Sequence, residues 1–92
     1  MATYLMFGKY SASAVRAISA KRTDEAAALI KQHGGKLKAG YALLGDVDLV
    51  LVVELPDTEH VMQASAGLSK LLGISFSTAP AVSLEDFDKL MG

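Results

Sequence analysis

The sequence has no cysteine and only two prolines among its 92 residues. Without cysteine there is no disulfide, no thiolate metal ligand and no thiol nucleophile. Small secreted domains commonly depend on disulfides, so this composition predicts a cytoplasmic protein. A chain that is 51% apolar with so few prolines is expected to fold, and its length predicts one domain over residues 1–92.

The chain also lacks an excess of charge of either sign and lacks long hydrophobic runs. Its net charge is −1, whereas nucleic-acid binding normally requires a clear basic excess that neutralises phosphates. No apolar run approaches the ~20 residues that span a bilayer. The first residues, Met1–Tyr4, contain no basic segment typical of a signal peptide. We therefore expect neither a nucleic-acid partner nor a membrane partner.

Residue patterns predict strands and helices in alternation. Apolar and aromatic runs predict four strands, at residues 3–10, 36–44, 47–55 and 74–82. Helical spacing and capping residues predict three helices, at residues 20–32, from Asp57 to about Leu72, and from Ser83 to Met91. A short helix after Ser11 or Ser13 precedes the first of these, unless the two form one long helix with a kink near Ser19.

This order of elements indicates an α+β fold, β-α-β-β-α-β with a short C-terminal helix, which is the ferredoxin-like arrangement. In that topology four antiparallel strands form one sheet, the first and third strands are central, and both helices cover one face. Gly45 and Asp46 predict a two-residue hairpin turn, because glycine accepts positive φ there. Pro80 predicts an edge position or a bulge for the fourth strand, since proline cannot donate to a strand ladder.

The third strand is apolar on both of its faces. Val50 and Val52 alternate with the leucines and the valine of the other face, whereas a strand with one wet face should carry polar residues there. Two helices cover only one face of a sheet, and monomers rarely expose a large contiguous apolar patch. We therefore expect a second copy on the other face, giving a homodimer or higher oligomer with a dimeric α/β barrel. The alternative is that the C-terminal helix folds over this face, although about eight residues cover only part of it.

Several short motifs follow one another in a family-specific order. They include Lys21-Arg22, Gly34-Gly35-Lys36, and the hairpin Leu44-Gly45-Asp46-Val47-Asp48. With this spacing the sequence resembles, over nearly its whole length, the GYD domain family, named for a Gly-x-Tyr-Asp signature. Gly45 and Asp48 keep the signature, but Val47 stands where the family has tyrosine, so a role for that hydroxyl is absent. The family resembles the dimeric α/β-barrel superfamily and has no established activity, so the resemblance implies a fold rather than a reaction.

The hairpin also carries the candidate catalytic acids. Asp46 and Asp48 lie two residues apart, and either carboxylate could act as a general base. Alternatively, Asp46 is a turn residue and Asp48 hydrogen-bonds nearby backbone. Asp48 is the stronger candidate, because it begins an apolar strand where an acid is unexpected. His33 is a weaker candidate, and its place at a helix C-terminus alternatively suits a partial positive charge.

Candidate ligand-binding residues are aromatic or basic. Tyr4 and Tyr41, like Tyr10, could line a pocket and offer a hydroxyl to a ligand, or they pack in the core with the hydroxyl at its rim. Arg16 and Arg22 could hold an anionic ligand at the pocket entrance, or they form part of a solvated face.

No metal and no cofactor is expected, because His33 and His60 are far apart and no set of three or four ligands has a metal-binding spacing. Histidine as a haem ligand is a minor alternative. The favoured function is a small ligand-binding or assembly module that forms a homodimer through its sheet. The alternative is a cofactor-independent enzyme of isomerase, monooxygenase or dehydratase type, acting on a small apolar or aromatic molecule, with Asp48 or a histidine moving a proton. A cavity with such a group directed into it would favour the enzyme.

Overall fold

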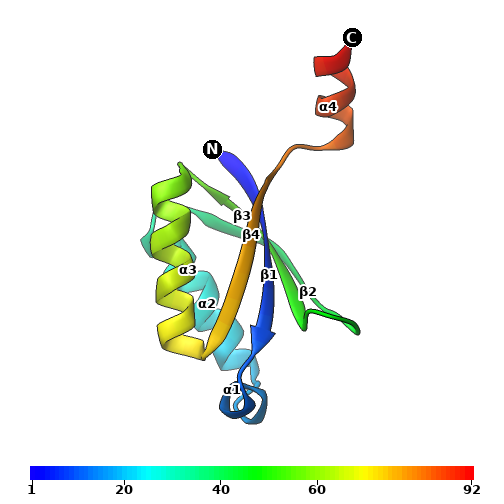
Figure 1. Ribbon diagram of the computed structural model, residues 1–92. Coiled ribbons are helices and arrows are strands. Elements are labelled where there is room, and N and C mark those ends of the chain that lie inside the picture. The colour runs from blue at the N-terminus through cyan, green and yellow to red at the C-terminus, as the bar shows by residue number, and fades with distance from the viewer.

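The computed structural model describes residues 1–92 as four strands and four helices. The strands are β1 (Ala2–Tyr10), β2 (Lys36–Ala42), β3 (Leu49–Leu55) and β4 (Ile74–Ala81). The helices are α1 (Ala12–Arg16), α2 (Ala20–Gln32), α3 (Thr58–Leu72) and α4 (Leu84–Met91). Helices α2 and α3 lie side by side against one face of the sheet (Figure 1), which gives an α+β fold with one helical layer.

The sheet has the strand order β2-β3-β1-β4, and every neighbouring pair is antiparallel. This confirms the ferredoxin-like topology with β1 and β3 in the centre. Pro80 lies on the edge strand β4 opposite Tyr4, as predicted from its missing N–H. The other edge strand, β2, has a shift in register between Leu37 and Ala39.

Serine caps divide the first helical segment into two helices. The Ser11 hydroxyl accepts a hydrogen bond from the backbone N–H of Ala14, and the Ser19 hydroxyl accepts one from that of Arg22. Each cap satisfies an N–H that has no partner within its helix, so each serine begins a helix of its own. The alternative of one long kinked helix is therefore wrong.

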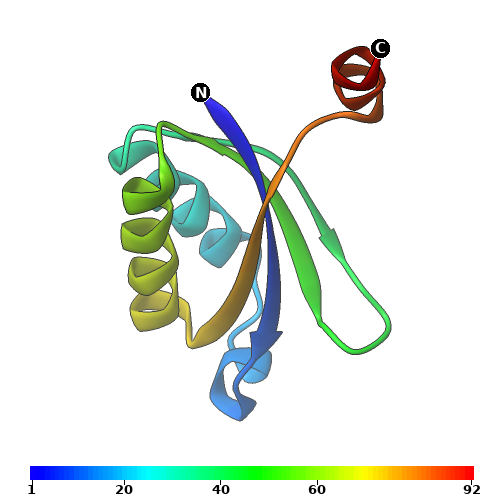
Figure 2. The same cartoon turned by 45° about the horizontal axis from the view of Figure 1, so that its top comes forward.

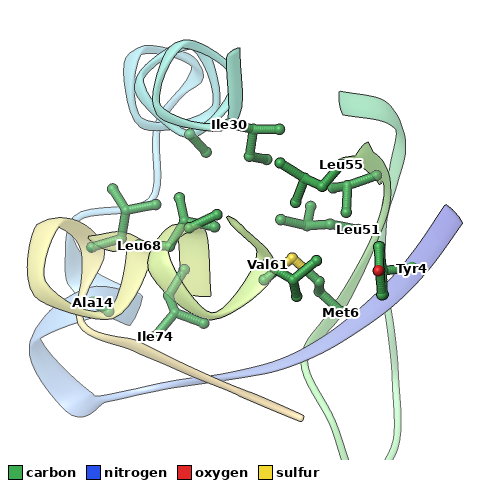
Figure 3. Packing of buried hydrophobic residues seen from close by; sticks show 13 residues of the cluster. Tyr4, Met6, Ala14, Ile30, Leu51, Leu55, Val61, Leu68 and Ile74 are labelled. Atoms are coloured by element: carbon green, nitrogen blue, oxygen red, sulfur yellow. The ribbon is translucent and has the colours of Figure 1, made fainter. Parts of the chain in front are cut away.

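The core lies between the helical layer and the sheet. It contains 13 buried residues contributed by β1, β3, β4 and the first three helices. Figure 3 shows Ile30 of α2 and Leu68 of α3 reaching toward this centre, with Met6 of β1 below Val61. A side chain in place of Gly8 would have its Cβ 2.7 Å from Leu49 and 2.9 Å from Ile74. A larger residue would therefore force these neighbouring side chains to shift.

The hairpin between β2 and β3 is wider than predicted. β2 ends at Ala42 and β3 begins at Leu49, so residues 43–48 form a six-residue loop, and the prediction of a two-residue turn at Gly45 and Asp46 is wrong.

Asp48 connects the base of the wide loop to β1. Its backbone N–H donates to the carbonyl of Gly8 at 2.8 Å, and its carboxylate accepts from the backbone N–H of Tyr10 at 2.9 Å. Both of these bonds go to β1. The N–H of Leu43 donates to the carbonyl of Asp48 at 2.8 Å and closes the base of the loop.

The second face of the sheet is left without a helix. Helix α4 continues past the end of β4 and stands away from the rest of the chain, as the two views agree (Figures 1 and 2). None of its residues is buried. The alternative that the C-terminal helix folds over this face is therefore wrong for the single chain. No helix here combines the length and the apolar character needed to cross a membrane.

Candidate functional site

A cavity of about 80 Å³ lies between α1, α2 and the helix-covered face of the sheet, and we call it the α2 cavity. Nine of its 12 lining residues are hydrophobic, among them Ile18, Leu49 and Ile74. The other three are Ser19, Arg22 and Thr23, at the start of α2. The cavity therefore has apolar walls and a polar side.

Arg22 is the charged group of the α2 cavity. Its side chain is half-buried, and its Nη2 donates to the backbone carbonyl of Leu72 at the end of α3. The protein has two ion pairs, Lys38–Glu54 and Lys89–Glu85, and a close contact between His60 and Asp57. None of them includes Arg22, which therefore has no carboxylate within 4.0 Å. A guanidinium has five N–H donors, and most of those of Arg22 remain available.

Tyr10 lines the same cavity and connects it to Asp48. The Asp48 carboxylate binds the backbone N–H of Tyr10, which is the last residue of β1. This is the backbone role that the sequence left open as an alternative to catalysis. No aspartate, glutamate or histidine lines the cavity.

The other two tyrosines lie elsewhere. Tyr4 is 6% exposed, belongs to the core and borders a groove between α3 and β4. Thr78 borders the same groove, and its buried hydroxyl has no hydrogen-bond partner. Tyr41 is 61% exposed on the edge strand β2. The structure thus keeps Tyr4 and Tyr41 apart from each other and from Arg22.

The remaining candidate residues do not converge. Arg16 is exposed in the last turn of α1 and does not line the α2 cavity. Asp46 is exposed in the loop of residues 43–48. His33 forms the C-cap of α2, where its backbone N–H donates to the carbonyls of Leu29 and Ile30.

His60 pairs with the residue that caps α3. Its Nδ1 lies 2.6 Å from the Asp57 carboxylate, which also accepts from the His60 backbone N–H at 2.9 Å. These hydrogen bonds hold the pKa of Asp57 below the ordinary value of 3.8. No group of three or more His, Asp or Glu side chains is placed to hold a metal ion.

A second candidate site is the uncovered side of the sheet, which we call the open face. Its centre consists of Leu5 and Phe7 of β1 with Val50 and Val52 of β3, where Leu5 pairs with Val52 and Phe7 with Val50. All four are half-buried in the single chain. On β2, Tyr41 pairs with Val50 and extends the apolar row to the edge of the sheet.

Polar residues border the open face at both ends. At one end Glu54 pairs with Thr3 and with Lys36, and the Lys38 ammonium lies 4.0 Å from the Glu54 carboxylate. At the other end Lys9 pairs with Ser75. An apolar centre within a polar rim is the usual anatomy of a protein–protein interface.

Sequence reasoning missed most walls of the α2 cavity. Ile18 lies in the linker between α1 and α2 and is 59% exposed. An apolar residue in a linker, next to a capping serine, is a signal that could have identified Ile18 as a cavity residue. Leu72 and Ile74 flank Gly73 and gave no such signal, because each fits an ordinary core pattern.

Comparison with known proteins places the fold. The leucine response regulatory protein of Mycobacterium tuberculosis superposes with a TM-score of 0.60 at 8% identity, over 89% of this chain and 51% of that chain. A crystal structure of a glutamate-to-alanine mutant superposes with a TM-score of 0.59 at 10% identity, over 89% of this chain and 50% of the other. This chain thus spans about half the length of each, and at such identity the likeness shows the fold alone.

The sequence itself provides the family. No curated protein matches it. The family model of the GYD domain matches residues 4–91, which is almost the whole chain and includes the hairpin with Gly45 and Asp48. The chain therefore belongs to the GYD domain family.

Proposed function

We propose that this chain is a small ligand-binding module that assembles as a homodimer through the open face of its sheet. The observation that carries the proposal is the apolar centre formed by Leu5, Phe7, Val50 and Val52, which no part of the chain covers. Contiguous apolar surface of this kind is normally buried against another surface. A second copy is the simplest cover, because most soluble oligomers are closed homo-oligomers.

The geometry of the sheet suits such a partner. Two sheets pack about 10 Å apart when their apolar faces meet. The polar rows at both ends of the open face would then form the solvated rim of the interface. The pair would enclose the apolar centre between two sheets with helices outside, which is a dimeric α/β barrel.

Ligand binding is favoured over catalysis by the lining of the α2 cavity. An enzyme of the proposed type needs a group that moves a proton at the substrate. The cavity has no acid and no histidine among its lining residues, and Asp48 is engaged by the backbone of Tyr10. The cysteine-free composition favours the cytoplasm as the place where such a module works.

The name of the leucine response regulatory protein indicates a response to a small molecule with an apolar body. That name supports small-molecule binding as a use of this fold. The ligand of this chain, however, is argued from its own cavity.

Sedimentation equilibrium tests the assembly. The unmodified chain should sediment as a dimer at micromolar concentration. Val52→Asp places a charge in the centre of the open face, and a twofold interface contains every substitution twice. We expect this variant to weaken the dimer by at least about 30-fold, because an unpaired charge is costly to bury.

Gln63→Asp is the matched control. It adds the same charge on the exposed side of α3, away from the open face, and should leave the dimer unchanged. Circular dichroism establishes that both variants are folded. An unmodified chain that remains monomeric at micromolar concentration would contradict the proposed assembly without reference to any variant.

A further inference from the structure

We propose that the α2 cavity binds a small monocarboxylate with a short branched apolar body, its carboxylate on the guanidinium of Arg22. This inference deepens the ligand-binding part of the proposed function and rests on it. It does not depend on the dimer, because all lining residues come from one chain and the cavity lies on the helix-covered side of the sheet.

The first argument is the unpaired charge of Arg22. A charged group that is half-buried normally has a partner of opposite charge, because removal from water is costly. The Arg22 side chain has only the neutral carbonyl of Leu72 as its hydrogen-bond partner and takes part in no ion pair. The bond to Leu72 fixes the side chain beside the cavity. A carboxylate suits the free donors, since it accepts two parallel hydrogen bonds from a guanidinium.

The second argument is the size of the cavity. Its volume of about 80 Å³ is about half of the ~150 Å³ that holds a benzene ring. The space therefore suits a branched body of about four carbons rather than an aromatic ring. Leu49, Leu51 and Ile74 provide apolar walls for such a body.

The lining also excludes related ligands. A zwitterionic amino acid would bring an ammonium group, and no carboxylate lines the cavity to bind it. A phosphate with two negative charges would need more than one cation, and Arg22 is the only one in the lining. Ser19 and Thr23 add neutral hydroxyls that are compatible with a single carboxylate.

The test uses isovalerate and isovaleramide, which have the same apolar body and differ in the charge of the head group. Each is titrated into the ¹⁵N-labelled full chain and followed by the amide resonances. We expect isovalerate to bind at least about fivefold more tightly than isovaleramide, as hydrogen bonds to a charged group are stronger. The shifts should occur at Arg22, Thr23 and Ile74, and be absent at Leu5 and Val52 of the open face.

Arg22→Gln should reduce the preference for isovalerate to about one, because the charge is lost. Because the ratio of the two affinities is compared, a general loss of stability from the lost bond to Leu72 does not affect the result. Lys21→Gln is the matched control. It removes the same charge from the neighbouring exposed residue, which does not line the cavity, and should leave the ratio unchanged.

Three results would overturn the inference. These are a ratio near one in the unmodified chain, a ratio that survives Arg22→Gln, and resonance shifts that fall on the open face. Sedimentation of the unmodified chain beside its titration separates the two proposals. An unmodified chain that binds isovalerate but sediments as a monomer would reject the dimer and keep the ligand site, whereas an unmodified dimer without a preference for isovalerate would do the reverse. Val52→Asp should keep the preference for isovalerate as a monomer, because Val52 does not line the α2 cavity.

Discussion

Asp48 has a structural role at the boundary between β1 and the hairpin loop. Its carboxylate takes the backbone N–H of Tyr10, and its own N–H donates to the carbonyl of Gly8. This explains why an aspartate stands at the start of an apolar strand: its carboxylate accepts a hydrogen bond from the backbone N–H of Tyr10, which would otherwise lack a partner. The same bond keeps Tyr10 in place beside the α2 cavity.

We expect Asp48→Ala to lower the free energy of unfolding by about 1–2 kcal/mol, because the half-buried N–H of Tyr10 loses its acceptor. Asp48→Asn retains an oxygen in a similar position and should cost clearly less. Urea unfolding at neutral pH measures both changes. Equal stability of Asp48→Ala and the unmodified chain would mean that this hydrogen bond contributes nothing to folding.

At the scale of the element, the start of α3 is sensitive to pH. Asp57 accepts hydrogen bonds from the backbone and the side chain of His60, and its folded-state pKa is therefore below the ordinary value of 3.8. A carboxyl group with a lowered pKa stabilises the folded state fully at pH values above its unfolded pKa. This contribution is lost as the pH falls through the lower pKa of the folded protein.

Asp57→Ala should therefore be less stable than the unmodified chain at neutral pH, and the two stabilities should converge as the pH falls below 3.8. Thermal unfolding across the acid range measures the difference. Ser19→Ala removes a cap without a titratable group from the packed helix α2 and serves as the comparison. A difference between Asp57→Ala and the unmodified chain that stays constant down to the lowest pH would contradict the role of the charged cap.

The elements show what the sequence can predict and where it stops. The caps at Ser19 and Asp57 were predictable, because capping depends on residues a few positions away. The hairpin was not, since the base of its loop contacts β1 through the bond between Asp48 and Tyr10, which are 38 residues apart. The strand order followed from the order of elements alone.

The candidate site was less predictable for the same reason. Arg22 and Tyr10 were identified from their residue types, and the structure places both at the α2 cavity. Tyr41 was proposed on the same grounds, but lies on the open face. Which of these side chains share a cavity depends on how distant segments pack, and no local pattern contains that information.

At the scale of the whole molecule, α4 is separate from the folded body. It has no buried residue, and its large apolar side chains, such as Leu84 and Phe87, are exposed. We expect a chain ending at Val82 to keep its stability within about 0.5 kcal/mol, because few contacts are lost.

The measurement is urea unfolding of residues 1–82 and of the full chain, both with Val52→Asp so that assembly does not enter the comparison. A loss above about 1 kcal/mol would mean that α4 packs on the body in solution.

The two edges of the sheet have a consequence for aggregation. Edge strands offer unpaired backbone groups to other molecules, and proteins protect them with proline, lysine or irregular pairing. Pro80 lies on β4, while β2 has Lys36, Lys38 and a shift in register. Strand addition is thus discouraged at both edges, so the sheet resists growing into a fibre. The association proposed for the open face closes instead at two copies. We therefore expect a solution of this protein to remain free of aggregates during long storage.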